Sequence, residues 1–189
     1  IDSYDIIDRV STFGGTNLMR HSGCSELDTQ YLQDQTIDFL GYGIKLLPGQ
    51  TTTCTNAKVF YYPNNETIFI PAQTQLIISC FIYENTLTSE NSSDKINFTY
   101  YQYYSNGSSQ VNPSFALNTT GLITYKTKDS SDRNIKGTNF QISIPSTATG
   151  YIIIGPRKIE LGNKPTDWSP CPYDLVTYDS TNQALVFFQ

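Results

Sequence analysis

Apolar and polar residues alternate with a period of two in two stretches of the chain, 75–83 and 96–104. Successive side chains of a β-strand point to opposite faces, so this alternation predicts two strands that each bury one face in a core. On the first strand the predicted core residues are Leu76, Ile78, Cys80 and Ile82. On the second strand they are Ile96, Phe98 and Tyr100.

Shorter stretches rich in β-branched and aromatic residues follow, and turn residues separate them. They predict further strand regions at 36–47, 51–62, 67–70, 122–127 and 139–144. Ser105-Asn106-Gly107-Ser108 has the composition of a hairpin turn. Strands with turns every ~8–12 residues and no long helical period predict an all-β chain folded as an antiparallel β-sandwich.

The segment 1–13 has a different spacing. Ile6, Val10 and Phe13 fall at positions i, i+4 and i+7, which predicts a short helix. Such a helix is too short to be stable alone, and a disordered leader is the alternative interpretation.

The stretch 150–174 combines a strand with an extended exit. Gly155-Pro156 interrupts the strand, and a strand tolerates that pair only at a bulge or an edge. Pairing is expected to resume beyond this point as far as Leu161. Trp168 is the only tryptophan, and prolines follow it at 170 and 172, which favour an extended chain.

Two motifs in the sequence carry a family resemblance. KIELGNKPTDWSPCPYD, at 158–174, resembles the closing signature of a β-sandwich module of phage tail and baseplate proteins, which is similar to jelly-roll carbohydrate-binding modules. Gly14-Gly15-Thr16-Asn17-Leu18-Met19, with Ser22 after it, resembles the opening of the same modules. The sequence departs from the usual pattern at His21, Cys24 and Cys171.

This resemblance implies a jelly-roll β-sandwich over 14–174, preceded by the leader 1–13. The segment 175–189 would be a linker or the start of a next domain, with a strand-like run at 184–188. The resemblance also implies a place in an extracellular virion tail, beside other tail subunits and as a homo-oligomer, most plausibly a trimer. The expected function is binding of a host cell-surface glycan. The alternative is a structural spacer or trimerisation module that binds no ligand.

Composition narrows the class of ligand. The 189 residues fit one domain, and their net charge of −5 argues against nucleic acid, which requires a basic surface. Charged residues make up only 15% of the chain, whereas it contains 14 Tyr and 10 Phe. Such a surface suits a neutral polar ligand. No apolar run approaches the ~20 residues of a membrane span, so membrane insertion is not expected.

The candidate ligand site is an aromatic platform. Tyr101 and Tyr103 share the outward face of 96–104, and Phe81 and Tyr83 share the outward face of 75–83. If these two strands pair, four rings line one side of a sheet, ready to stack against sugar rings. The alternative is that the same face packs against a subunit or a loop. The predicted ligand-binding residues are Tyr83, Tyr101, Tyr103, Asn97, Thr99 and Gln141.

Three other features are weaker candidates for a site. A cluster of cations at Lys126, Lys128, Arg133 and Lys136 would suit phosphate groups of a cell-wall polymer, or it is an ordinary solvated loop. Trp168 is interpreted as a buried structural plug rather than a binding residue. Related jelly rolls often hold a structural calcium ion, and Glu160, Asp167 and Asp174 would be its ligands here. No other cofactor or metal is expected.

Catalysis has little support in the sequence. His21 is the only histidine, and neither a Gly-x-Ser-x-Gly nor a His-Glu-x-x-His motif is present, so an enzyme is not expected. The cysteines contain no Cys-x-x-Cys pair and are predicted to be unpaired thiols, with two disulfides as the alternative. They are Cys24, Cys54, Cys80 and Cys171.

Overall fold

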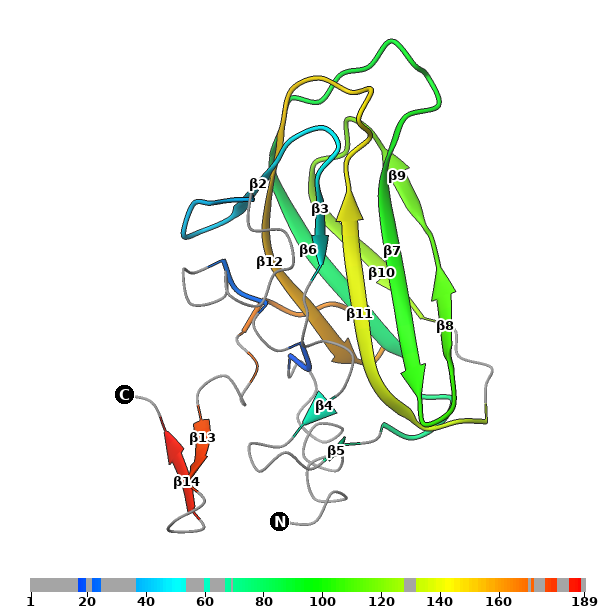
Figure 1. Cartoon of the computed structure of the whole chain (residues 1–189), viewed down its shortest axis with the longest axis vertical. Coiled ribbons are helices and arrows are strands. Elements are labelled where there is room, and N and C mark those ends of the chain that lie inside the picture. The colour runs from blue at the N-terminus through cyan, green and yellow to red at the C-terminus, as the bar shows by residue number, and fades with distance from the viewer. Residues whose placement is uncertain are drawn as a thin grey trace.

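The computed structural model describes residues 17–19, 22–24, 37–53, 60–61, 67–68, 70–127, 132–169, 171, 176–179 and 184–187 (Figure 1). Within these ranges every regular element is a β-strand. None of the described residues forms a helix long and apolar enough to span a membrane. The predicted helix at 1–13 lies outside the described residues, so it and the predicted domain boundaries stay predictions.

The strands follow one another in short steps along the chain. The first are β1 (Asp38–Phe39), β2 (Ile44–Leu46), β3 (Thr51–Thr53), β4 (Phe60–Tyr61) and β5 (Thr67–Ile68). The central ones are β6 (Leu76–Asn85), β7 (Lys95–Tyr104), β8 (Ser108–Val111), β9 (Ser114–Ala116) and β10 (Gly121–Lys126). The last are β11 (Ile135–Ser143), β12 (Ile152–Leu161), β13 (Val176–Asp179) and β14 (Ala184–Phe187).

Two antiparallel sheets pack face to face (Figure 1). The first, called the β12 sheet here, has the order β1-β2-β12-β6-β10. The second, called the β7 sheet, has the order β3-β11-β7-β8, with β9 also paired to β7. Two hairpins, β4-β5 and β13-β14, form separate two-stranded sheets. The all-β antiparallel sandwich of jelly-roll type predicted from the sequence is confirmed.

The core lies between the two sheets and is built from the predicted faces. Ile78 and Ile82 on β6 are 0% and 1% exposed, and Ile96 and Phe98 on β7 are 0% and 2% exposed. Apolar area removed from water contributes ~25 cal/mol per Å², so these side chains supply much of the drive to fold. The alternation in sequence therefore identified the core face of both long strands correctly.

The interruption at Gly155-Pro156 is a bulge inside β12. The register between β12 and β6 shifts between Ile153 and Ile154 and again between Ile154 and Arg157. As predicted, pairing then resumes and continues to Leu161. The partner of Leu161 on β6 is Leu76.

The turn predicted after β7 is also present. The Tyr104 backbone N–H donates to the Gly107 carbonyl over 3.0 Å, and Gly107 has φ of +93°, a conformation that favours glycine. The chain then returns along β7 as β8. Sequence patterns missed β8 and β9, because these edge strands have only four and three residues and bury no alternating apolar face.

Candidate functional site

The predicted aromatic platform is divided between the two sheets. Strand β6, which carries Phe81 and Tyr83, pairs with β12 and β10, whereas β7 pairs with β11, β8 and β9. Tyr83 therefore lies on the outer face of the β12 sheet. Tyr101 and Tyr103 lie on the outer face of the β7 sheet, on the opposite side of the sandwich. The four-ring surface required β6 and β7 to pair; they do not, so that surface is not formed.

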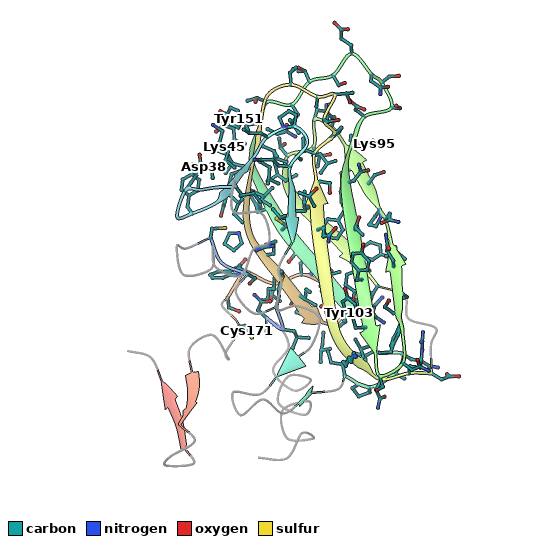
Figure 2. All side chains as sticks on the ribbon, in the orientation of Figure 1. Asp38, Lys45, Lys95, Tyr103, Tyr151 and Cys171 are labelled. Atoms are coloured by element: carbon teal, nitrogen blue, oxygen red, sulfur yellow. The ribbon has the colours of Figure 1, made fainter. Side chains whose placement is uncertain are left out.

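The other predicted residues are brought together on the β7 sheet. Tyr101 and Tyr103 alternate with the buried residues Tyr100, Gln102 and Tyr104, so their rings stand on the outward face. The two ring centroids are 6.2 Å apart, and the ring planes differ by 16°. This gives two nearly parallel aromatic rings in a row along one strand, with Tyr103 toward the end of β7 that is lower in Figure 2.

Polar side chains continue this row along β7. Thr99 is the cross-strand partner of Gln141, and Asn97 is the partner of Ser143. On the other side of β7, Gln110 is the partner of Tyr101. The distance along the strand from Asn97 to Tyr103 is ~20 Å, long enough for several linked sugar rings. None of the outward positions of β7 over this length carries a charged residue.

Polar side chains on the inward face of β7 are buried and bond to one another. The Tyr100 hydroxyl donates to Gln102 Oε1 over 2.8 Å, and Gln102 Nε2 donates to the Tyr104 hydroxyl over 3.2 Å. The Tyr104 hydroxyl also bonds Ser109 Oγ on β8 over 3.1 Å. Buried polar groups satisfied in this way hold their strand in one arrangement. The outward rings at 101 and 103 are thus carried by a well-fixed backbone.

The predicted cation cluster does not form one patch. Lys126 lies on β10 of the β12 sheet, whereas Lys136 lies on β11 of the β7 sheet, and Lys128 is outside the described residues. The Arg133 guanidinium sits 3.8 Å from the centroid of the Tyr104 ring and donates to the Asn106 carbonyl over 2.8 Å. These contacts hold Arg133 against the turn after β7.

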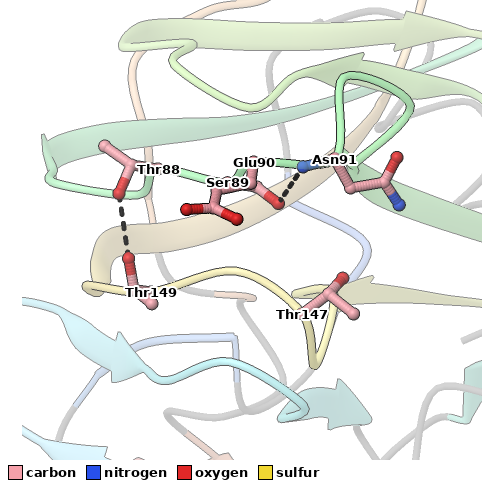
Figure 3. Close-up of a pocket in the computed structure, with 6 residues that line it drawn as sticks. All are labelled: Thr88, Ser89, Glu90, Asn91, Thr147 and Thr149. Carbon is pink, nitrogen blue, oxygen red and sulfur yellow. Dashed lines mark hydrogen bonds between the residues drawn. The ribbon is translucent and has the colours of Figure 1, made fainter.

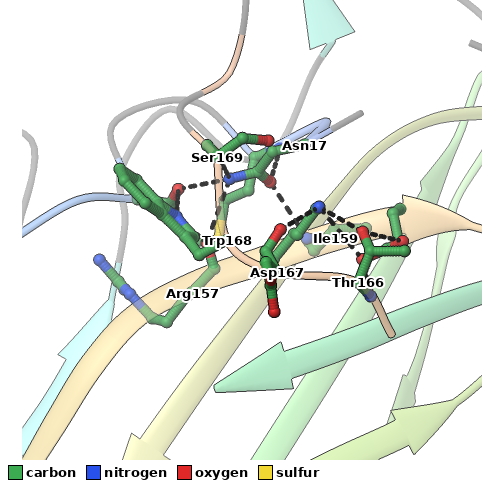
Figure 4. A network of polar contacts seen from close by, with 11 residues as sticks. Asn17, Arg157, Ile159, Thr166, Asp167, Trp168 and Ser169 are labelled. Carbon is green, nitrogen blue, oxygen red and sulfur yellow. Dashed lines mark hydrogen bonds and ion pairs between the residues drawn. The ribbon is translucent and has the colours of Figure 1, made fainter. Parts of the chain in front are cut away.

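The opening and closing motifs meet around one buried side chain (Figure 4). Asn17 is 0% exposed, and its Nδ2 donates to Ser22 Oγ, the Arg157 carbonyl and the Ser169 carbonyl over 2.9, 3.2 and 2.9 Å. Its Oδ1 accepts from the backbone N–H groups of Met19 and Ile159 over 3.0 and 3.1 Å. Segments 140 residues apart in sequence are joined here, so the motif residues serve the fold.

A second buried group lies further along the closing motif. Lys158 and Glu160 are 2% and 1% exposed and form an ion pair of 3.4 Å. Lys158 Nζ also donates to Thr166 Oγ1 and to the Asp167 carbonyl, each over 2.7 Å. Glu160 accepts from the Thr166 backbone N–H and hydroxyl over 3.1 and 2.9 Å. This pair holds the segment after β12 against the outer face of the β12 sheet. Ile77 on β6 points to that outer face, yet it is 0% exposed.

Trp168 does not have the buried position that was predicted. Its side chain is 41% exposed, because the closing segment runs along the outside of the sandwich. Its indole Nε1 donates to the Arg157 carbonyl over 3.1 Å and lies 3.4 Å from Ser22 Oγ. The ring therefore contributes a hydrogen bond to the network around Asn17 rather than a filled core position.

We expect Trp168→Ala to lower the free energy of unfolding by ~1–2 kcal/mol, the value of a partly buried contact and one hydrogen bond. Complete burial would predict ~3–5 kcal/mol. Chemical denaturation monitored by circular dichroism measures the difference. Trp168→Phe keeps one aromatic ring but removes the N–H donor and the pyrrole part of the indole, so it should lose less than the alanine variant. Loss of ~4 kcal/mol or more in Trp168→Ala would contradict this assignment.

One pocket lies at the end of the sandwich where the β6–β7 and β11–β12 loops meet (Figure 3). It has a volume of about 580 Å³ and is lined by Thr88, Ser89, Glu90, Asn91, Thr147 and Thr149. Asp94 joins these loops by accepting from Ser89 Oγ and Thr147 Oγ1, each over 2.6 Å, and these bonds lower the pKa of its carboxyl group. No aromatic ring lines the pocket, so it offers no stacking surface.

The predicted calcium site is not formed as a cluster in the part of the chain that the structure describes. The Glu160 carboxylate is engaged with Lys158 and Thr166, and Asp174 is outside the described residues. Among the residues that the structure describes, no group of three His, Cys, Asp or Glu side chains could hold a metal ion.

The cysteines in the described ranges are buried. Cys80 is a free thiol in the core, as predicted, and burial raises its pKa to about 12. Such a thiol is almost entirely protonated at neutral pH and is a weak nucleophile. Cys24 and Cys171 are 3% and 2% exposed, and Cys54 lies outside the described residues, so the prediction for all four cysteines stays a prediction.

Comparison with known proteins adds only distant similarities. No protein-family model matches this chain, and no curated protein matches it in sequence. One similar solved structure is an arabinose-bound GH51 α-L-arabinofuranosidase, with a TM-score of 0.42 and 10% identity. That match covers 80% of this chain and 27% of the arabinofuranosidase.

Two further structures contain carbohydrate-binding modules. A CBM61 module in complex with β-1,4-galactotriose matches with a TM-score of 0.39 and 7% identity, over 77% of this chain and 99% of the module. The CBM22-GH10 modules of Clostridium thermocellum xylanase 10B, complexed with xylohexaose, match with a TM-score of 0.37 and 8% identity, over 84% of this chain and 26% of theirs. The chain thus spans about a quarter of the length of each of the two glycoside hydrolases. These similarities transfer no ligand to it.

Proposed function

We propose that this chain is a saccharide-binding module whose binding surface is the outer face of the β7 sheet. The observation that carries the proposal is the nearly parallel pair of rings at Tyr101 and Tyr103, in line with the uncharged polar side chains of Asn97 and Thr99 on the same strand. The C–H faces of a sugar pack against aromatic rings, and amide and hydroxyl groups such as those of Asn97 and Gln141 bond sugar hydroxyls. Because strands hold these groups in register, little conformational entropy is lost on binding.

We propose further that the module serves in a phage tail, fibre or baseplate protein and attaches the virion to a glycan on the host-cell surface. The resemblance of the motifs at 14–22 and 158–174 to tail and baseplate modules supports this setting. A neutral glycan offers no ion pair to this face, so affinity for one copy should be weak. Several copies on one particle, as in a trimer, would raise the effective affinity by avidity.

A binding panel tests the function directly. The protein, as a monomer and as a trimer on a fused trimerisation domain, is applied to immobilised bacterial cell-wall polysaccharides and to arabinan, galactan and xylan. We expect the trimer to bind at least one of these polysaccharides and the monomer to bind it poorly. Binding should persist at high salt, because a neutral glycan makes no ion pair that salt could screen. A folded trimer that binds none of the panel would favour the spacer interpretation.

The double variant Tyr101→Ala/Tyr103→Ala should lose detectable binding in the trimer, because both stacking rings are removed. Tyr101→Phe/Tyr103→Phe is the matched control, since it keeps the rings and should retain most of the binding. Thermal melting of each variant confirms that it is folded. If the folded alanine variant binds the panel as well as the parent, the Tyr101–Tyr103 face is not the binding surface.

A further inference from the structure

Exposed apolar side chains gather on the outer face of the β12 sheet. Tyr42, in the turn between β1 and β2, is 58% exposed, and Phe81, Tyr83 and Leu122 are 43%, 49% and 54% exposed. Phe81 and Leu122 are cross-strand partners. The Phe81 and Tyr83 rings lie 5.2 Å apart at 48°, and the Tyr42 and Tyr83 rings lie 5.9 Å apart at 61°. These four residues are called the Tyr83 corner below, because the rings of Tyr42, Phe81 and Tyr83 meet at steep angles.

Gly155 makes room for this arrangement, and Gly43 lies beside it. Tyr83 is the residue that the pairing of β6 with β12 passes over, and its ring lies above Gly155. A Cβ atom at Gly155 would lie 2.8 Å from the Tyr83 ring, and one at Gly43 would lie 3.6 Å from it. Any side chain at 155 would therefore displace the ring. The β12 bulge thus serves to seat Tyr83 on the sheet while about half of its surface faces solvent.

Fixed polar groups stand beside the aromatic rings. The Tyr151 hydroxyl donates to the Glu84 carboxylate, and this bond raises the pKa of Tyr151, with a smaller contribution from Tyr42. Lys45 Nζ lies 4.5 Å from the centroid of the Tyr151 ring. Figure 2 shows Lys45 and Tyr151 together on the side of the sandwich away from Tyr103. The Glu84 carboxylate, the Lys45 ammonium group and the carboxylate of Asp38, which is the cross-strand partner of Lys45, all retain capacity for further hydrogen bonds.

The size of the Tyr83 corner indicates what kind of partner fits it. Its side chains expose roughly 400 Å², if each presents ~200 Å² in full and about half of that is exposed. A stable protein–protein interface needs ~800 Å² from each partner. The corner cannot extend toward the other end of the sheet, because the segment held by Lys158 and Glu160 covers it there. A small ligand with both apolar faces and hydroxyl groups suits these dimensions and this mixture of groups.

We propose that the Tyr83 corner is a second saccharide-binding surface, which takes a neutral oligosaccharide against the Tyr42 and Tyr83 rings and bonds its hydroxyls to Glu84. The proposal extends the saccharide-binding function proposed above, but it does not require the Tyr101–Tyr103 face to bind. Because the two surfaces lie on opposite sides of the sandwich, one copy of the module would hold two glycan chains at once.

The test uses amide NMR of the ¹⁵N-labelled chain titrated with short oligosaccharides prepared from galactan, xylan and arabinan. We expect changes in the amide chemical shifts of residues 42–43, 81–84 and 155, and these changes should saturate as oligosaccharide is added. Tyr42→Ala should weaken this binding roughly 2- to 10-fold, the effect of removing one stacked ring. Tyr42 is the preferred position because it lies in an exposed turn, so its replacement should not disturb folding. Leu47→Ala, at a residue that is 45% exposed and outside both surfaces, is the control and should change nothing.

The outcomes separate the two proposals. Shifts confined to the Tyr101–Tyr103 face would overturn the second surface and leave the proposed function standing. Chemical-shift changes confined to the Tyr83 corner would support the second surface and would contradict the proposal that the Tyr101–Tyr103 face binds saccharide. Shifts at both, with those at 81–84 retained in Tyr101→Ala/Tyr103→Ala, would support two independent surfaces. Shifts at neither would overturn both.

Discussion

Replacing Asn17 by alanine should lower the free energy of unfolding by ~3–5 kcal/mol, one of the largest effects of any single substitution in this chain. The side chain is fully buried and makes five hydrogen bonds that join the opening segment to β12 and to the closing segment. Its loss leaves the buried N–H groups of Met19 and Ile159 without their acceptor, and each unmade bond costs ~1–3 kcal/mol. Urea denaturation followed by circular dichroism measures the change.

Two variants sharpen this prediction. Asn17→Asp keeps the oxygen that accepts from Met19 and Ile159, but it turns an oxygen toward the carbonyl groups of Arg157 and Ser169. We expect it to be destabilising as well, because the donor is what joins the closing segment. Asn112→Ala, at an exposed asparagine that accepts one bond from Gln110, should change stability by less than ~0.5 kcal/mol. An Asn17→Ala protein as stable as Asn112→Ala would show that the network contributes little.

Lys158→Met should destabilise the protein by ~3–5 kcal/mol, since it leaves the buried Glu160 carboxylate without its cation. The methionine side chain has a similar length, so the loss reports charge and hydrogen bonding more than packing. The Thr166 hydroxyl and the Asp167 carbonyl lose the Lys158 donor at the same time. Differential scanning calorimetry should therefore show a much lower melting temperature for this variant.

The double variant Lys158→Met/Glu160→Gln distinguishes charge from packing. It removes both charges, while the introduced glutamine side chain can still accept from Thr166, so it should recover part of the stability lost in Lys158→Met. An exposed pair would not behave in this way, because removing one partner of a solvated ion pair costs only ~0–1 kcal/mol. If the double variant is less stable than Lys158→Met, the ammonium group is not compensating the buried carboxylate.

Local sequence signals predicted the long strands and their buried faces. Ile78 and Ile82 on β6 and Phe98 on β7 were identified from the alternation of apolar and polar residues, because a strand at the surface of a core must bury every second side chain. An interruption at Gly155-Pro156 was also predicted, as a bulge or an edge, since proline lacks the N–H that regular pairing requires. The structure shows a bulge. The short edge strands β8 and β9 gave no such signal.

The candidate site illustrates the limit of this reasoning. Alternation places Tyr101, Tyr103 and Asn97 on one outward face, and the structure confirms that placement. It does not say which strands are neighbours, because a strand's inward face is apolar whichever sheet it joins. For that reason Tyr83 was grouped with Tyr101 although it lies on the other side of the sandwich. Trp168 was placed in the interior from its motif, although the position of the closing segment leaves it 41% exposed.

The sequence by itself therefore determined the all-β class, the core faces of the long strands and the presence of an uncharged tyrosine-rich surface. These properties depend on side-chain period and composition, which are local. Only the tertiary structure decided that the tyrosines form two surfaces on opposite sheets. It also decided that Asn17, Lys158 and Glu160 attach the opening and closing segments of the chain to the β12 sheet. Those arrangements depend on contacts between segments as much as 152 residues apart, and no local pattern encodes which distant segments meet.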